Sequence, residues 1–144
     1  MSEIKYLCFD IGGVANVRLP DYVITSLANK HFAKEFSQED FRKIVRSADK
    51  DYWREFQNGH IDTETYLGQA LETGTLSITQ KNKVLLCNLL KEWCGIPYQP
   101  VLDLVETLKK NGYYTSVLSN NNGIMYNTPG AEIKNRVHLS LSSH

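Results

Sequence analysis

The first apolar segment of the chain is a short run over residues 4–9, which stops at the sequence Asp10-Ile11-Gly12-Gly13. A nearly continuous apolar run of this length, bounded by glycines, predicts a buried β-strand with a turn at its C-terminal end. We therefore expect a strand over residues 4–9 that leads directly into Asp10.

Between Pro20 and about Gly95 the apolar positions recur with the spacing of helices, and no strand pattern interrupts them. Capping residues mark where these helices are expected to begin or end. They are Ser37-x-x-Asp40, Asn58-Gly59, Asp62 or Thr63, Gly74 and Ser77-x-x-Gln80. The last of them precedes a long helix that carries leucines inward as far as Trp93.

Strand patterns return after Pro97. Residues 101–108 have amphipathic helical spacing and the helix is expected to end at Asn111-Gly112. Residues 113–118 are expected to form a strand, and a polar turn occupies 119–123. A short helix around 130–135 precedes residues 137–141, where apolar and polar residues alternate as they do in a strand. Strands that alternate with helices predict a parallel sheet with right-handed crossovers.

Composition narrows the classes of partner. Acidic and basic residues balance at 16 each, so net charge favours neither nucleic acid nor a membrane surface as a partner. The apolar stretches are too short to span a bilayer. The three cysteines have no CxxC spacing, which favours buried reduced thiols and a cytoplasmic location.

Two polar residues are expected at the same edge of the predicted sheet. Asp10 and Ser119 each follow a strand, and ligands of open parallel sheets bind beyond the carboxyl ends of the strands. Taken singly, each residue also suits an ordinary turn. Their combination with a long helical insertion is more specific.

These features resemble the haloacid dehalogenase (HAD) superfamily. Tyr6-Leu7-Cys8-Phe9-Asp10-Ile11-Gly12-Gly13-Val14 resembles its first motif, and Val117-Leu118-Ser119-Asn120 resembles its second. The insertion, including Phe56-Gln57-Asn58-Gly59-His60-Ile61, resembles the helical cap of the subfamily that includes haloacid dehalogenases and sugar-phosphate phosphatases. The expected fold class is α/β: a partial, Rossmann-like parallel sheet of about three strands in residues 1–18 and 96–144, with a helical cap in 19–95.

The resemblance implies magnesium-dependent hydrolysis of a small phosphorylated substrate through an aspartyl-phosphate. Asp10 would be the nucleophile and would bind Mg²⁺ together with the backbone carbonyl of Gly12. Gly13 would keep the turn clear of the substrate, and Ser119 would donate a hydrogen bond to a phosphoryl oxygen. Asn120 and Asn121 would lie against the substrate.

The chain departs from the family pattern in two respects. Many family phosphatases have a second Asp at the position of Gly12, which serves as a general acid. The third-motif lysine and the fourth-motif acidic pair have no counterpart, and Lys134 does not match. The chain thus resembles only the N-terminal part of the family. We expect weak or absent Mg²⁺ binding, little turnover, and an exposed strand 4–9 that a further C-terminal segment or an oligomer covers.

Three other interpretations stay open at this point. The Gly12 form of the first motif also suits dehalogenase-like displacement at carbon. The chain could be a catalytically inactive HAD-like regulator or interaction module. Finally, Asp10-Ile11-Gly12-Gly13 also occurs in the phosphate loop of sugar kinases with the actin-like fold, where the loop leads directly into a second strand of a hairpin.

Overall fold

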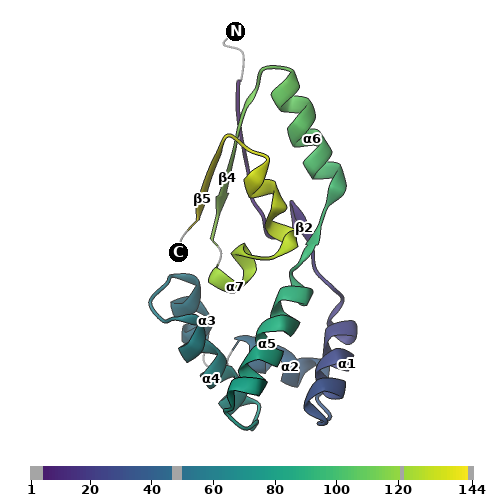
Figure 1. The fold of residues 1–144 in the computed structure, drawn as a ribbon, viewed down its shortest axis with the longest axis vertical. Coiled ribbons are helices and arrows are strands. Elements are labelled where there is room, and N and C mark those ends of the chain that lie inside the picture. Colours follow the sequence, from purple (N-terminus) through teal and green to yellow (C-terminus); the bar gives the residue numbers. More distant parts are fainter. Residues whose placement is uncertain (1–4, 47–49, 121, 143–144) are drawn as a thin grey trace.

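The computed structural model describes residues 5–46, 50–120 and 122–142. A three-stranded parallel sheet occupies one half of the molecule, and the helices of residues 21–93 occupy the other (Figure 1). The strands are β1 (Tyr6–Phe9), β4 (Tyr114–Ser119) and β5 (Leu139–Ser142), in the order β1-β4-β5. The expected α/β fold with a partial parallel sheet is confirmed.

One face of this sheet is packed and the other is open. The packed face meets α6 (Gln99–Lys110) and the 3₁₀ helix η1 (Pro129–Asn135), which matches the short helix expected near residue 130. The buried residues of this layer are Ile11, Ala15, Leu102, Val105, Val117, Ala131 and Ile133. They hold β1 and β4 in a parallel register in which Phe9 lies beside Val117.

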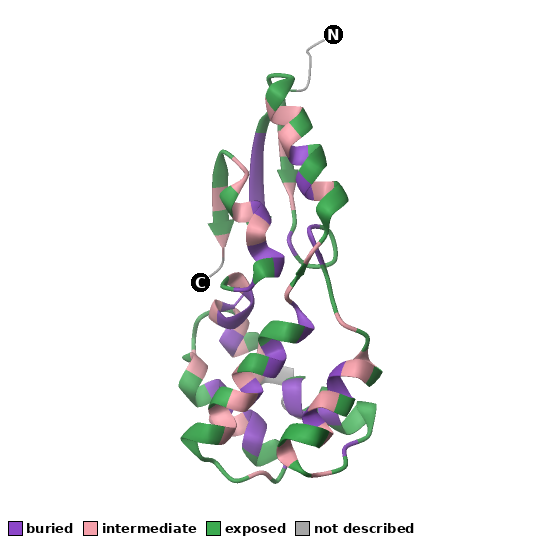
Figure 2. Cartoon of the chain, turned by 45° about the vertical axis from the view of Figure 1, so that its right-hand side comes forward, coloured by how far each residue is buried: buried purple, intermediate pink, exposed green. Residues whose placement is uncertain are grey.

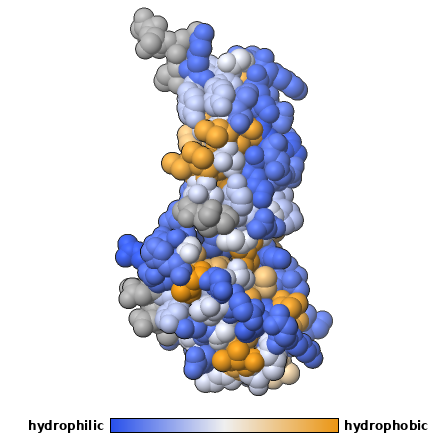
Figure 3. Space-filling model, turned by 60° about the vertical axis from the view of Figure 1, so that its left-hand side comes forward, coloured by the Kyte–Doolittle hydropathy of each residue, from blue (hydrophilic) through white to orange (hydrophobic). Residues whose placement is uncertain are grey.

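On the open face, Leu118 of β4 and Leu141 of β5 are register partners that lie side by side, and they are 62% and 52% exposed. Figure 3 shows a hydrophobic patch on the sheet half of the molecule, in addition to hydrophobic patches on the helical half. Within the described ranges β1 pairs with β4 alone and lies at the edge of the sheet, where the sequence placed an exposed strand. That an oligomer or a further segment covers β1 stays a prediction.

The helical half has its own core, with buried positions on the inward sides of the helices (Figure 2). Its helices are α1 (Asp21–Phe32), α2 (Gln38–Arg46), α3 (Lys50–Gln57), α4 (Thr63–Thr73) and α5 (Gln80–Trp93). At its centre the rings of Phe56 and Tyr66 stack with their centroids 4.3 Å apart. None of the described helices is long and apolar enough to cross a membrane.

Most of the expected helix caps are present. The backbone N–H of Asp40 donates to Ser37 Oγ at 3.1 Å, and the N–H of Ser37 donates back to Asp40 Oδ2 at 3.3 Å, which forms the predicted capping box. The prediction that Ser77 caps the next long helix was wrong. The extended residue Thr79 caps α5 instead, because its hydroxyl accepts from the N–H of Asn82 at 3.2 Å.

Two short elements that the sequence did not predict connect the halves. Strand β2 (Asn16–Val17) pairs antiparallel with β3 (Ile96–Pro97), so the chain leaves and re-enters the sheet half along two adjoining segments. The division into residues 1–18 with 96–144 and a cap of 19–95 stays a prediction. Helix α7 (Gly123–Tyr126) was also missed.

Candidate active site

The structure brings Asp10 and Ser119 together at the carboxyl ends of β1 and β4. Because Phe9 and Val117 are register partners in parallel strands, the residues that follow them meet at one edge. Ser119 is buried, and its hydroxyl donates to Asp10 Oδ1 at 3.2 Å. This distance is long for an O–H···O bond, so the hydroxyl can turn to another acceptor at little cost.

The turn after Asp10 is built from backbone bonds. The N–H of Ile11 donates to Asp10 Oδ1 at 2.7 Å, and the N–H of Ala15 donates to the Ile11 carbonyl at 3.0 Å. Gly13 has φ +74°, a conformation that a residue with a Cβ adopts only under strain. Asp10 Oδ2 accepts no hydrogen bond from the described residues, so this oxygen is the one available for chemistry.

Asn16 fixes this turn and was not predicted. Its side-chain oxygen accepts from the N–H of Gly13 at 3.0 Å, and its Nδ2 donates to the Cys94 carbonyl at 3.0 Å. Asn16 is buried, and its bond to the Cys94 carbonyl is shielded from water, whereas its bond to Gly13 is partly buried. No local pattern marks Asn16 in the sequence, because its partner Cys94 comes from the far end of the helical block.

The three asparagines after Ser119 have different places. Asn120 is exposed and lines the cavity at Asp10. Asn121 lies outside the described residues. Asn122 is 1% exposed, and its Oδ1 accepts from the N–H of Met125 at 3.0 Å, so it caps α7.

A cavity of about 210 Å³ opens beside Asp10. Its described lining residues are Asp10, Gly12, Asn16, Arg18, Gln57, Cys94, Ser119, Asn120 and Met125. Asp10 is the one carboxylate among them. Burial raises the pKa of the Cys94 thiol, which keeps it neutral and a poor nucleophile.

A larger cavity of about 380 Å³ adjoins the first and shares Arg18, Gln57 and Met125 with it. Its other lining residues are Val45, Arg46, Trp53 and Trp93. The Arg18 guanidinium lies 5.6 Å from the centroid of the Trp93 ring, within cation–π range. The sequence did not predict this aromatic cavity, because its walls come from distant helices.

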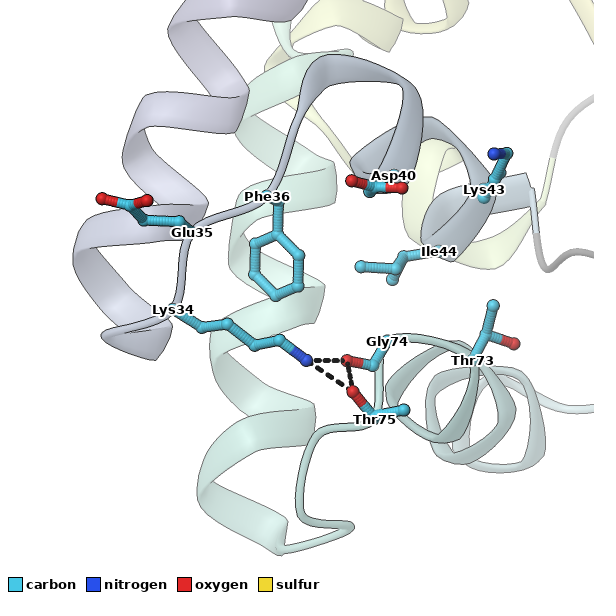
Figure 4. Close-up of a pocket in the computed structure, with 9 residues that line it drawn as sticks. All are labelled: Lys34, Glu35, Phe36, Asp40, Lys43, Ile44, Thr73, Gly74 and Thr75. Carbon is cyan, nitrogen blue, oxygen red and sulfur yellow. Dashed lines mark hydrogen bonds between the residues drawn. The ribbon is translucent and has the colours of Figure 1, made fainter.

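A third cavity, of about 340 Å³, lies in the helical half and does not include Asp10 (Figure 4). Lys34 Nζ crosses it and donates to the Gly74 carbonyl at 2.7 Å, at the C-terminal end of α4. Lys43, also on its wall, pairs with Glu39 at 3.0 Å. Both lysines are thus used by the cap itself, which favours a structural role for this cavity.

The donors at the small cavity suit Mg²⁺ only in part. The Asp10 carboxylate and the Gly12 carbonyl are available oxygen ligands, but no cluster of three or more His, Cys, Asp or Glu side chains occurs in the described ranges. Mg²⁺ held by one carboxylate depends on water and substrate phosphate for its remaining ligands. These residues fit a magnesium ion that binds together with phosphate.

No protein-family model matches the chain, and no curated protein matches its sequence. Solved structures do match. A HAD family enzyme from Bacteroides thetaiotaomicron has a TM-score of 0.71 at 18% identity, over 99% of this chain and 70% of that one. A complex of the same enzyme with magnesium and inorganic phosphate gives 0.65 at 18%, over 98% and 69%.

A 2-haloacid dehalogenase from Pseudomonas syringae pv. Tomato DC3000 gives a TM-score of 0.62 at 17% identity, over 98% of this chain and 64% of that one. At such identities the likeness concerns the fold. The chain therefore has the fold of HAD enzymes, over about two thirds of their length, and the resemblance seen in its motifs is confirmed at that level.

The structure does not have the hairpin that the sugar-kinase interpretation requires. In that interpretation, the segment after Asp10-Ile11-Gly12-Gly13 returns beside β1 as the second strand of a hairpin. In the structure that segment forms β2, which pairs with β3, and the chain then enters α1.

Proposed function

We propose that this chain carries the nucleophile and phosphate-binding side of a HAD-like phosphohydrolase acting on a small phosphorylated metabolite. The observation that supports it is the meeting of Asp10 and Ser119 beside a cavity at the carboxyl ends of β1 and β4. A carboxylate is ionised at neutral pH, so Asp10 needs no neighbouring base to act as a nucleophile.

Each residue has a defined part in this reaction. Asp10 Oδ2 attacks phosphorus, while Oδ1 stays oriented by the N–H of Ile11. Ser119 turns its hydroxyl from Asp10 to a phosphoryl oxygen, and Gly13 leaves room for the substrate. A magnesium ion held by Asp10 and the Gly12 carbonyl would lower the repulsion between carboxylate and phosphate. Asn120 contacts the substrate from the rim.

Turnover by this chain is expected to be slow. Asp10 is the one carboxylate among the described lining residues, so these residues offer neither a second carboxylate for the metal nor a carboxylic acid to protonate the leaving group. A positioned general acid contributes about 10²- to 10⁴-fold to such reactions.

The cytoplasmic location also stays part of this proposal, because it rests on unpaired cysteines.

Hydrolysis of p-nitrophenyl phosphate with Mg²⁺, by the chain and by Asp10→Asn, tests the proposal. We expect a low rate that the substitution abolishes. A rate that Asp10→Asn leaves unchanged would exclude Asp10 as the nucleophile. Phosphate binding without any hydrolysis would favour the inactive regulator.

Displacement at carbon is a second candidate, favoured by Gly12. A halide leaves without a proton, so a site that lacks a general acid is less impaired for dehalogenation than for loss of an alkoxide. Release of chloride from chloropropionate by the chain, lost in Asp10→Asn, would support this activity over the phosphatase.

A further inference from the structure

Arg18 occupies an unusual place in the molecule. It lines both the small cavity at Asp10 and the aromatic cavity next to it. Throughout the described ranges its guanidinium makes no hydrogen bond or ion pair, and it lies over the face of the Trp93 ring. A cation held on an aromatic ring between two cavities is ready to receive an anionic group of a ligand.

The aromatic cavity has a distinct chemistry. Val45, Trp53, Trp93 and Met125 give it apolar walls, and Arg46 adds a second guanidinium. No acidic residue is among its described lining residues. A planar apolar body would pack against the indoles, and a carboxylate on that body would match the guanidinium groups in shape and charge.

The chemistry of the small cavity also favours an aryl leaving group. Gly12 cannot donate a proton, and the described walls of the small cavity offer no other carboxyl. The departing oxygen must then be stable as an anion. A phenol, with a pKa of about 10, meets this condition far better than an aliphatic alcohol.

We propose that the substrate is an aryl phosphomonoester whose ring carries a carboxylate, with the ring in the aromatic cavity and the carboxylate on Arg18 and Arg46. The inference rests on the proposed phosphatase function and specifies its substrate class. Asp10 Oδ2 forms a bond to phosphorus as the bond from phosphorus to the aryl oxygen breaks. The phenolate leaves with the electron pair and takes its proton from water. Water then releases phosphate from Asp10.

The chain contains two tryptophans, and both line the aromatic cavity, so their fluorescence reports its occupancy. We would titrate the full chain, in Mg²⁺, with para-carboxyphenyl phosphate, phenyl phosphate, glycerol phosphate, inorganic phosphate and para-hydroxybenzoate. Calorimetry would measure the binding affinity of the same ligands independently. Variants Arg18→Gln and Arg46→Gln would be compared with Arg42→Gln, which alters an arginine paired with Asp21 outside both cavities.

We expect para-carboxyphenyl phosphate to bind about tenfold or more tightly than phenyl phosphate, since a charge-assisted hydrogen bond is worth that much. Glycerol phosphate should bind more weakly than both. Arg18→Gln or Arg46→Gln should abolish the preference for the carboxylate, and Arg42→Gln should preserve it.

Two failures can be told apart. If inorganic phosphate binds and glycerol phosphate binds as tightly as the aryl esters, the substrate class is wrong while the proposed function stands. In the other failure, no phosphorylated ligand binds while para-hydroxybenzoate quenches the tryptophan fluorescence in an arginine-dependent way. In that case the phosphatase proposal fails, and the aromatic cavity is shown to bind an aryl carboxylate. A carboxylate preference unaffected by either arginine variant overturns the inference.

Discussion

Asn16 Nδ2 donates a hydrogen bond of 3.0 Å to the carbonyl oxygen of Cys94, 78 positions further along the chain. The same side chain accepts from the N–H of Gly13. One buried amide therefore joins the turn after Asp10 to the C-terminal end of α5. The position of the turn relative to the helical half depends on this link, because β2 and β3, which run beside it, pair over only two residues each.

Replacing Asn16 by Ala should destabilise the chain. The substitution leaves a buried carbonyl and a backbone N–H without partners, at about 1–3 kcal/mol for each group that stays dry. We expect the free energy of unfolding in urea to fall by about 2–3 kcal/mol, and phosphate affinity to fall with it. Asn127→Ala removes a similar bond at an exposed site, to the Gly123 carbonyl, and should cost less than about 0.5 kcal/mol. Equal losses in both variants would contradict the role of Asn16.

Gly13 and Gly112 form a matched pair for testing the turn. Both have positive φ, +74° and +81°, and a Cβ would meet no atom within 4 Å at either position. Substitution by Ala should therefore cost about 1–2 kcal/mol of backbone strain in each case. Only Gly13→Ala should also weaken phosphate binding, measured by calorimetry, because Gly13 lies in the turn that follows Asp10. A matching loss of affinity in Gly112→Ala would attribute the effect to global destabilisation.

The site could be predicted from the sequence only as far as local patterns reach. Asp10 and Ser119 end apolar runs, and parallel strands place such ends at one edge, so their meeting follows from periodicity and topology. Arg18 and Asn16 contact Trp93 and Cys94 at the C-terminal end of α5, and no spacing along the chain predicts contacts of that kind.

The fold was predictable to a similar extent. Helices with strong periodicity and clear caps were confirmed, as at Ser37 and Asp40. Strands β2 and β3 have two residues each, too few for an alternating pattern. At the start of α5, Ser77 and Thr79 are both capable of capping a helix, and only tertiary packing decides which one does.

Mg²⁺ and phosphate should bind cooperatively. Asp10 is the one carboxylate among the described residues of this cavity, so phosphate is expected to supply part of the metal's ligand set, and each ligand then raises the affinity of the other by the same factor. We expect calorimetric Mg²⁺ affinity to rise about tenfold or more when phosphate is present. Asp10→Asn should remove this coupling. Tight Mg²⁺ binding that is independent of phosphate would show that the site has ligands beyond Asp10 and Gly12.

The open sheet face should cause self-association. Leu118 on β4 and Leu141 on β5 are register partners, and both expose apolar surface on the open face of the sheet. We expect concentration-dependent oligomers in sedimentation equilibrium, and fewer of them when both leucines are replaced by Lys. Leu104→Lys, at a 47% exposed position on α6, is the control and should have no such effect. A monomer at all concentrations would refute the prediction.

Tyr66 should make the stability of the helical half dependent on alkaline pH. Its ring is fully buried, its hydroxyl donates to the Val45 carbonyl, and burial raises its pKa far above the ordinary value of 10.0. A group with a raised folded-state pKa stabilises the fold below the unfolded pKa, and this contribution is lost as pH rises above it. In urea denaturation the free energy of unfolding should therefore fall above about pH 10, with a component of about 1.4 kcal/mol per pH unit from this group. Tyr66→Phe should lack that component, whereas Tyr22→Phe, which changes an exposed tyrosine, should retain it. Identical pH slopes for Tyr66→Phe and the unmodified chain would show that Tyr66 ionises without unfolding its surroundings.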